Sequence, residues 1–244
     1  MCYHLSLKFG KTAMSQRYKI REENNKDNSL PLAYLNAFSF PKMPAVFNSV
    51  THSDKRVCEA MQWGLIPHWI KTNEEAVKIR EMTLNARMET IGQKPAFKNA
   101  YANNRCLIPY SAYFEWREVQ KQKYPYAILP ESQIGSLAGI FNEWGDPETG
   151  ELFFTVSIVT MEANPTIGQI HNTKKRMPIE IPQALEEDWL NAEKQNHSEI
   201  LEYNLTRMPS YFTISRTFRQ EVSLQNPDFP VAAEYPELAF YPIE

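Results

Sequence analysis

A run of closely spaced strand-like segments between residues 105 and 160 constrains the fold most strongly. These segments are rich in β-branched and aromatic residues, and turn-forming residues separate them. They cover residues 105–109, 112–119, 124–129, 136–144 and 152–160. Residues 145–150, with the sequence GDPETG, have the composition of a hairpin-type turn. We therefore expect the sheet core of the protein to lie in this half of the chain.

The segments on either side predict further strands and several short helices. We expect strands at 3–9, 45–50 and 56–65, and helices at 74–82, 97–103, after Pro182 and at 198–204. The polar segment 11–29 predicts a short helix followed by an exposed loop, and the proline-rich tail from residue 226 predicts a chain that wraps the surface. No internal repeat, low-complexity stretch or linker divides the sequence. We interpret residues 1–244 as a single α+β domain.

Composition and charge narrow the class of protein. The 244 residues are 43% hydrophobic, which is enough for a sizeable core, and the net charge of −3 gives no global reason to expect a polyanion partner. Cysteines at positions 2, 58 and 106 are odd in number and lack metal-type spacing. This favours a reduced cytoplasmic protein without a disulfide framework, metal or other cofactor. No apolar stretch approaches 18 residues, so we expect no membrane association.

The first residues predict an unusual reactive group. Methionine aminopeptidases remove Met1 when the next side chain is small, so Met1-Cys2 predicts a mature chain that starts with a free cysteine amine. An α-amine has a pKa of about 7.7–8.0 and a thiol one of about 8.5, so both have reactive forms near neutral pH. Together they can capture one aldehyde, first as an imine and then as a thiazolidine ring. The alternative is that Cys2 is an ordinary residue.

Two ionisable residues stand in contexts that suit acid–base chemistry. Glu115 is bracketed by aromatic residues in an expected core strand, where desolvation would raise its pKa and suit it for proton transfer. Simple strand alternation, with Glu115 facing water, is the alternative. His171 precedes the basic run Lys174, Lys175 and Arg176, a suitable place for an acid or base that meets an anionic ligand. A structural histidine is the alternative there.

Asn85 and Arg87 lie two residues apart and would share one side of an extended segment. Asn can orient a carbonyl or a sugar hydroxyl, and Arg can clamp a phosphate. A capped loop with a surface ion pair explains the same residues. Trp69 and Phe97 offer aromatic surfaces on which bases could stack, although core packing is the ordinary role of such side chains.

Taken together, these segments resemble the SOS-response-associated peptidase family, whose members cross-link themselves to abasic sites in single-stranded DNA. The matching segments are MC at 1–2, WGLIPHW at 63–69, NARMET at 85–90, RCLIP at 105–109, FEW at 114–116, and IH at 170–171 followed by RMP at 176–178. The resemblance covers most of the chain. It implies catalytic roles for Cys2, Asn85, Glu115 and His171, and a phosphate contact for Arg87.

The resemblance also implies a fold and a partner. We expect a barrel-like antiparallel sheet with peripheral helices and a positively charged groove that leads to the N-terminus. The expected partner is single-stranded DNA with abasic sites, bound by a monomer through Schiff-base chemistry after Met1 removal. The further cations expected to contact phosphates are Arg105, Lys174, Lys175 and Arg176. Two departures concern DNA affinity: Tyr3-His4 replaces the usual Gly-Arg, and the interval from His171 to Arg176 is longer than usual.

Two other classes of function remain open from the sequence. The first is a cysteine peptidase in which Cys2 is the nucleophile and His171 the base, possibly acting on its own N-terminus. A thiol protease gains nothing from a free amine, which counts against this class. The second is a non-catalytic DNA-binding module, which would leave Glu115 and His171 without a purpose.

Overall fold

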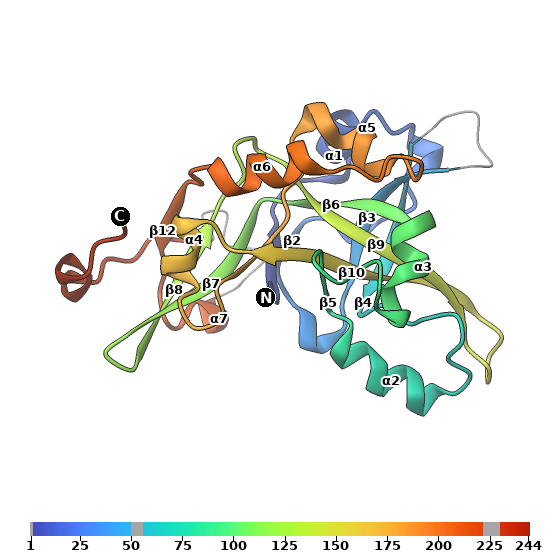
Figure 1. The fold of residues 1–244 in the computed structure, drawn as a ribbon, viewed down its shortest axis with the longest axis horizontal. Coiled ribbons are helices and arrows are strands. Elements are labelled where there is room, and N and C mark those ends of the chain that lie inside the picture. Colours follow the sequence, from blue (N-terminus) through green and yellow to red (C-terminus); the bar gives the residue numbers. More distant parts are fainter. Residues whose placement is uncertain (1, 50–55, 222–229) are drawn as a thin grey trace.

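The computed structural model of the protein describes residues 2–49, 56–221 and 230–244 (Figure 1). Its strands are β1 (His4–Leu7), β2 (Leu32–Asn36), β3 (Lys42–Asn48), β4 (Arg56–Trp63), β5 (Asn85–Arg87), β6 (Arg105–Tyr110), β7 (Ala112–Val119), β8 (Gln122–Ile128), β9 (Gly135–Gly145), β10 (Leu152–Glu162), β11 (Arg176–Pro178) and β12 (Tyr211–Thr213). Its α-helices are α1 (Lys11–Tyr18), α2 (Asn73–Met82), α3 (Pro95–Asn103), α4 (Pro165–Ile170), α5 (Glu186–Leu190), α6 (Ser198–Thr206) and α7 (Phe218–Glu221). Single 3-10 turns cover Glu22–Asn24, Ala37–Ser39, Gln183–Leu185 and Pro236–Phe240.

Strands β10, β9, β6, β3 and β4 pair in a closed ring. β9 pairs with both β6 and β10, β3 bridges β6 and β4, and β4 returns to β10. The ring is antiparallel except where β4 meets β10 in parallel. The buried side chains of this barrel belong to the main hydrophobic core, which includes Trp63, Leu107 and Ile140. The expected α+β fold with a barrel-like sheet and peripheral helices is confirmed.

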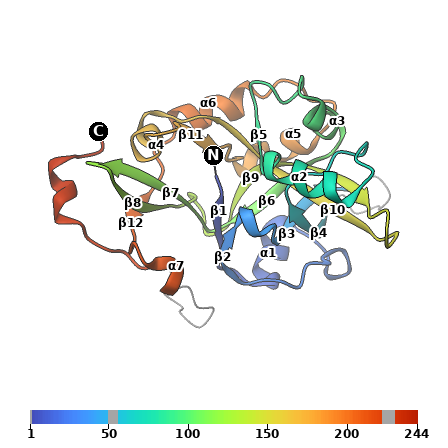
Figure 2. The ribbon, with the colours of Figure 1, turned by 90° about the horizontal axis from the view of Figure 1, so that it is seen from below.

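A second sheet, in the order β12-β8-β7-β1-β2, carries the N-terminal strand in its interior. β1 pairs antiparallel with β2 on one side and with β7 on the other, where Leu5 lies opposite Tyr113. Every residue of β1 is buried. The expectation of an N-terminal strand inside a sheet is therefore confirmed. Figures 1 and 2 show the start of β1 between β7 and β5.

Strand β10 also carries two short strands that help to build the site. β5 pairs with it in parallel, with Asn85 opposite Ile158 and Arg87 opposite Thr160. β11 pairs with it antiparallel, with Met177 opposite Met161. The expected helix and strand ranges gave no warning of β5 or β11, because three-residue strands have no measurable hydrophobic period.

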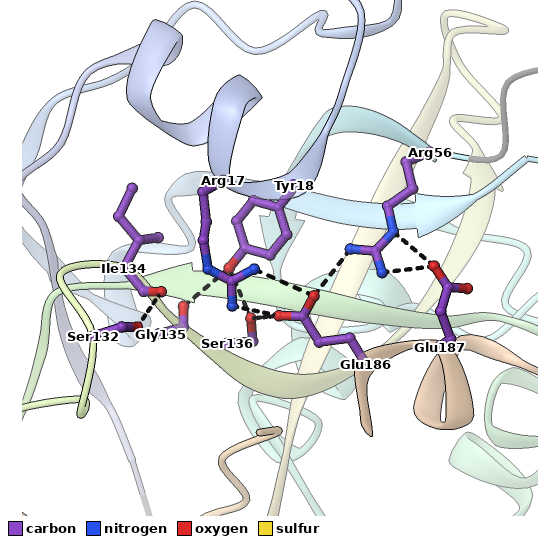
Figure 3. A network of polar contacts seen from close by, with 9 residues as sticks. All are labelled: Arg17, Tyr18, Arg56, Ser132, Ile134, Gly135, Ser136, Glu186 and Glu187. Carbon is purple, nitrogen blue, oxygen red and sulfur yellow. Dashed lines mark hydrogen bonds and ion pairs between the residues drawn. The ribbon is translucent and has the colours of Figure 1, made fainter. Parts of the chain in front are cut away.

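A buried ion network ties the N-terminal helix α1 to the C-terminal half of the chain (Figure 3). The carboxylate of Glu186 accepts hydrogen bonds from Arg17 at 2.7 Å, Arg56 at 3.1 Å and Ser136 at 2.6 Å. Tyr18 shares a hydrogen bond of 2.8 Å with Ser136. Because Glu186 is only 2% exposed, these partners offset the cost of burying its charge. The network joins α1, β4, β9 and α5.

Three expectations at the edges of the fold have different outcomes. The helix within residues 11–29 is confirmed, but the following loop is not fully exposed: Asn25 and Asp27 are buried and hydrogen-bonded. Polar side chains can satisfy each other locally, which the composition of the loop does not show. In the expected strand 45–50, β3 ends at Asn48, and Val50 lies outside the described residues. The tail is exposed from residue 230 onward except for partly buried side chains; residues 226–229 lie outside the described part.

Candidate active site

The carboxyl group of Glu115 lies at the centre of the candidate site. Glu115 is the fourth residue of β7, opposite Tyr126 of β8, and only 4% of it is exposed. Side chains on both faces of this part of β7 are buried. The alternative that Glu115 faces water on an exposed side of the strand is therefore wrong. Desolvation by burial raises the pKa of Glu115 to about 8, and the positive charge of the amino terminus opposes the rise. Glu115 is therefore largely protonated at neutral pH.

His171 ends helix α4 and lies against Glu115. Its Nδ1 is 2.8 Å from the carbonyl oxygen of Arg176 and 3.4 Å from Oε2 of Glu115. A carbonyl oxygen only accepts, so Nδ1 carries the hydrogen and Nε2 keeps a lone pair. Burial, the charge of the amino terminus and Lys174 lower the pKa of His171 to about 4, although the bond to Arg176 opposes this. The ring is neutral at pH 7, and its contact with Glu115 is not an ion pair.

Cys2 lies immediately before β1 and is fully buried. Its Sγ is 3.9 Å from the carbonyl oxygen of His4. Burial raises the pKa of the thiol well above its ordinary value, and the nearby carboxyl of Glu115 adds to the rise. The thiol is therefore protonated at neutral pH, and Glu115 is close enough to influence it.

Asn85 stands on β5 with an unused amide. It is 8% exposed, and within the described part of the chain neither Oδ1 nor Nδ2 has a hydrogen-bond partner. Such a buried amide costs stability unless something else binds it, and it is a reason to look for a ligand. Arg87, two residues further along β5, is exposed, and its charge opposes the burial-driven rise of the Tyr3 pKa.

A pocket of about 640 Å³ opens beside Glu115 and His171. Its walls combine aromatic and basic side chains from elements far apart in the sequence. The lining residues outside this pair include Tyr3, His4, Trp116, Lys123, Lys174, Arg216, Phe218 and Arg219. A partly enclosed, cationic and aromatic pocket next to an acid and a neutral imidazole suits an anionic substrate with a reactive carbon.

The basic run after His171 contributes unequally to this pocket. Lys174 lines it, whereas Lys175 is exposed and has a left-handed backbone with φ of 49°. Arg176 forms a two-pronged ion pair with Glu89, at 2.6 and 3.0 Å, and donates to the carbonyl oxygen of Thr160. The structure thus brings Lys174 to the pocket and gives Arg176 protein partners.

The remaining residues expected to bind DNA lie elsewhere. Trp69 is 40% exposed and does not line the pocket. Phe97 is 9% exposed and belongs to the hydrophobic core. Arg105 is 3% exposed, and its guanidinium donates to backbone carbonyls, including those of Tyr101 at 2.8 Å and Lys194 at 2.7 Å. Burial and protein partners favour a packing role for Phe97 and Arg105, and their DNA-binding roles stay predictions.

The sequence did not lead us to expect three basic residues that line the pocket. Arg216 and Arg219 lie around α7, and Lys123 lies near the start of β8. The interleaving of Arg216, Phe218 and Arg219 was a signal, since alternating basic and aromatic residues are typical of nucleic-acid surfaces. Because these three residues lie far from Glu115 in the sequence, the sequence did not show that they line the same pocket.

The arrangement of barrel, second sheet and site defines a family. The SOS response associated peptidase (SRAP) family matches residues 1–222, and the chain belongs to this family. The abasic site processing protein YoqW of Bacillus subtilis is 31% identical over 183 residues, which are 74% of this chain and 78% of YoqW. The abasic site processing protein HMCES of Xenopus tropicalis is 28% identical over 54% of this chain and 44% of its own length.

A solved structure has a similar fold. A crystal structure of a protein from Bacteroides thetaiotaomicron has a TM-score of 0.82 and 33% identity, and covers 96% of this chain and 100% of that chain. Within the described residues, no group of three His, Cys, Asp or Glu side chains is placed to hold a metal ion. No helix in the same part of the chain is long and apolar enough to cross a membrane.

Proposed function

We propose that this protein captures abasic sites in single-stranded DNA by forming a covalent thiazolidine cross-link through Cys2 after Met1 is removed. The observation that carries the proposal is the protonated, buried carboxyl of Glu115, which lies in the field of the amino terminus and 3.4 Å from His171. Glu115 also acts on the Cys2 thiol, and an acid of raised pKa near the residue whose amine reacts suits imine formation. The names of the relatives YoqW and HMCES support abasic DNA as the substrate.

The first chemical step forms an imine. The neutral amine of Cys2 adds to the aldehyde carbon of the ring-opened deoxyribose, which gives a carbinolamine. Glu115 gives its proton to the departing hydroxyl, which leaves as water, so a protonated imine and the Glu115 carboxylate remain. Because Glu115 has a pKa of about 8, it can both donate and accept a proton near neutral pH.

The second step closes the ring. The sulfur of Cys2 adds to the carbon of the protonated imine, whose nitrogen keeps its hydrogen, and the thiol proton passes to Glu115, so no further atom is lost. Burial and the neighbouring Glu115 raise the thiol pKa, so a base must remove that proton as the C–S bond forms. The Glu115 carboxylate left by the first step is the base in our proposal. Capture also requires the amine and thiol of the buried Cys2 to become accessible to the sugar.

His171 and Asn85 have supporting roles in this scheme. The neutral imidazole of His171, with its lone pair on Nε2, acts in the opening and reclosing of the sugar ring. Asn85 holds the sugar or the terminal amine with the buried amide that has no partner among the described residues. Positioning of this kind contributes to rate because it removes orientational freedom before reaction.

The DNA itself is bound by charge and by aromatic surfaces. Arg87, Lys174 and Lys175 are sequence-predicted cations with exposed side chains, and Lys174 also lines the pocket. We assign phosphate contacts to Arg87 and Lys174. Tyr3 lies at the pocket wall and packs against Phe38, with ring centroids 4.8 Å apart. Unpaired nucleotides can follow such a surface, whereas a duplex offers neither flexible phosphates nor open base faces. We therefore expect preference for single strands.

The geometry disfavours the cysteine peptidase. A peptidase thiol needs a lowered pKa and a strong base beside it, but the Cys2 thiol has a raised pKa and His171 one of about 4. Incubation of the protein with an abasic oligonucleotide and, separately, with a peptide library distinguishes the candidates. Our proposal predicts a covalent adduct whose mass equals protein plus oligonucleotide minus one water, and no peptide cleavage. Peptide cleavage without an adduct would establish the peptidase instead.

A further inference from the structure

A single arginine at the edge of the pocket is held in place by an unusual set of partners. Arg219, on the short helix α7, places its guanidinium over the ring of Trp116, 4.8 Å from the ring centroid. Its Nη2 is 3.3 Å from Nε2 of His4. Among the side chains that the structure describes, which exclude that of Glu221, no carboxylate pairs with Arg219. Two uncharged side chains, Trp116 and His4, therefore orient its guanidinium.

The ring of His4 is in a tautomer that accepts a hydrogen bond from Arg219. It is 8% exposed, and its Nδ1 lies 2.6 Å from the hydroxyl of Tyr34. A guanidinium only donates, so Nε2 must accept, and Nδ1 must carry the hydrogen that is donated to Tyr34. Burial, and next the charge of Arg219, lower the pKa of His4 to about 3, so the ring stays neutral. Trp116 packs edge-on against the same ring, 4.8 Å away.

The other arginine of this wall is committed differently. Arg216 stacks over Tyr124, 4.4 Å from the ring centroid, and pairs with Glu237 at 3.4 Å. It also donates to Gln122 at 3.0 Å. Arg216 thus has an anionic partner within the protein. Arg219 lines the same pocket as Lys174.

We propose that Arg219 is a phosphate ligand for the DNA strand beside the reactive nucleotide, and that His4 is the positioning residue that holds it there. The proposal rests on the proposed function for the identity of the anion, which is a phosphodiester. Stacking on Trp116 leaves the edge of the guanidinium available, and a planar fork of N–H groups matches two phosphate oxygens. A strand bound at Arg219 could reach Glu115, because both side chains line the same pocket.

The test measures binding without the covalent step. The probe is a single-stranded oligonucleotide with one tetrahydrofuran residue, which has no aldehyde, and its affinity is followed by fluorescence anisotropy across a salt series. Arg219→Gln should weaken binding about 5- to 20-fold and lower the slope of log K against log salt by about 0.7, the value for one phosphate contact on a single strand. Arg21→Gln makes the same charge change on an exposed residue outside this pocket and should alter neither quantity.

A second series locates the phosphate. Each phosphate of the probe is replaced in turn by a neutral methylphosphonate, and wild type is compared with Arg219→Gln. One position near the tetrahydrofuran should weaken wild-type binding and leave the variant unaffected. Equal effects on both proteins at every position would overturn the proposal, as would a wild-type protein that does not bind the probe. A wild type that binds the probe but does not cross-link an aldehyde oligonucleotide would sink only the proposed chemistry.

The role of His4 is tested by the coupling between Arg219 and its phosphate, which is measured in the same methylphosphonate series. Gln at position 4 offers an oxygen that can accept from a guanidinium, whereas Leu fills similar space and cannot. His4→Gln should therefore keep the coupling between Arg219 and its phosphate, and His4→Leu should lose most of it. Thermal melting of each variant checks the fold. A His4→Leu protein that is folded and keeps the full coupling would show that His4 does not position Arg219.

Discussion

Oε2 of Glu115 lies 3.4 Å from Nδ1 of His171, and burial drives both groups toward their neutral forms. The carboxyl has a raised pKa of about 8 and the imidazole a lowered one of about 4, so neither carries a full charge at pH 7. Nδ1 of His171 donates to the carbonyl oxygen of Arg176, so the lone pair of the imidazole is on Nε2. Glu115 can therefore act as an acid, and His171 as a separate base, on different atoms of one substrate. The protonation states of this pair determine the expected pH dependence of the reaction and the expected effects of replacing either residue.

The rate of cross-link formation should depend on Glu115 in a characteristic way. Reaction needs a neutral amine, with an ordinary pKa of about 7.7–8.0, and protonated Glu115 with a pKa of about 8. The rate should therefore peak near pH 8 and fall on both sides. Glu115→Gln should lower it by about 10² to 10⁴, which is about 3–5 kcal/mol of barrier, and should remove the fall at high pH.

Glu118→Gln is the matched control for that experiment. Glu118 lies on the same strand and does not line the pocket. Single-turnover rates at saturating oligonucleotide separate the chemical step from binding. If Glu115→Gln kept both the wild-type rate and its alkaline limb, another group would have to be the acid.

His171 should matter more for release than for capture. We assign it to opening and reclosing of the sugar, so His171→Ala should slow reversal of a preformed adduct more than it slows formation. His197→Ala is a control, because His197 is also buried but lies in a separate pocket lined by Asp188 and Lys194. Formation and release are measured separately for each variant. Equal losses in both rates would contradict the division of work between Glu115 and His171.

The raised pKa of Glu115 also predicts how stability changes with pH. Glu115 binds a proton more tightly when folded, with a pKa of about 8 against 4.5, so its contribution to stability is lost as pH rises through this range. His171 has the opposite shift, and its effect is complete above pH 6.5. Between pH 6.5 and 8, deprotonation of Glu115 lowers the free energy of unfolding by up to about 2 kcal/mol, and His171 adds no change in this range. Urea unfolding of Glu115→Gln should show a flatter decline; an unchanged decline would contradict the pKa shift.

Two arginines expected to contact DNA should behave differently when replaced. Arg105→Gln removes donors to several backbone carbonyls and should lower the free energy of unfolding by about 2–4 kcal/mol, without changing the salt slope of DNA binding. Arg87→Gln should leave stability within about 0.5 kcal/mol and lower that slope by about 0.7, because Arg87 is exposed. Unfolding curves and salt titrations of both variants check the pair. A reduced slope in Arg105→Gln would return that residue to the interface.

The sequence predicts the sheet and the reactive centre better than it predicts the walls of the pocket. The strand runs around Glu115 have strong local patterns, and β7, β9 and β10 appear within a few residues of their expected ends. The ion network of Glu186 and the contact between His4 and Arg219 depend on side chains more than 100 residues apart. No local pattern encodes such contacts. The sequence could not distinguish Arg105, which is buried, from Arg87, which is exposed, because residue type alone does not reveal whether an arginine is buried.

The site residues that the resemblance assigns remain predictions. Glu115 raises the pKa of the Cys2 thiol, and Asn85 has a buried amide on β5, which pairs with β10 of the other sheet. Cys58 and Cys106 are buried thiols elsewhere in the core and serve as controls. Cys2→Ser should retain at most a borohydride-trappable imine, whereas Cys58→Ala and Cys106→Ala should cross-link normally if folded. An adduct lost only in one of those two controls would point to a different cysteine.

The most direct measurement is the mass of the cross-linked N-terminal peptide. The protein is reacted with an abasic oligonucleotide, digested with protease and nuclease, and sequenced by mass spectrometry. Our account predicts a peptide that begins at Cys2, lacks Met1, and carries the sugar on both the amine and the sulfur with the loss of one water. An active protein that retains Met1, or an adduct on any residue other than Cys2, would contradict the account.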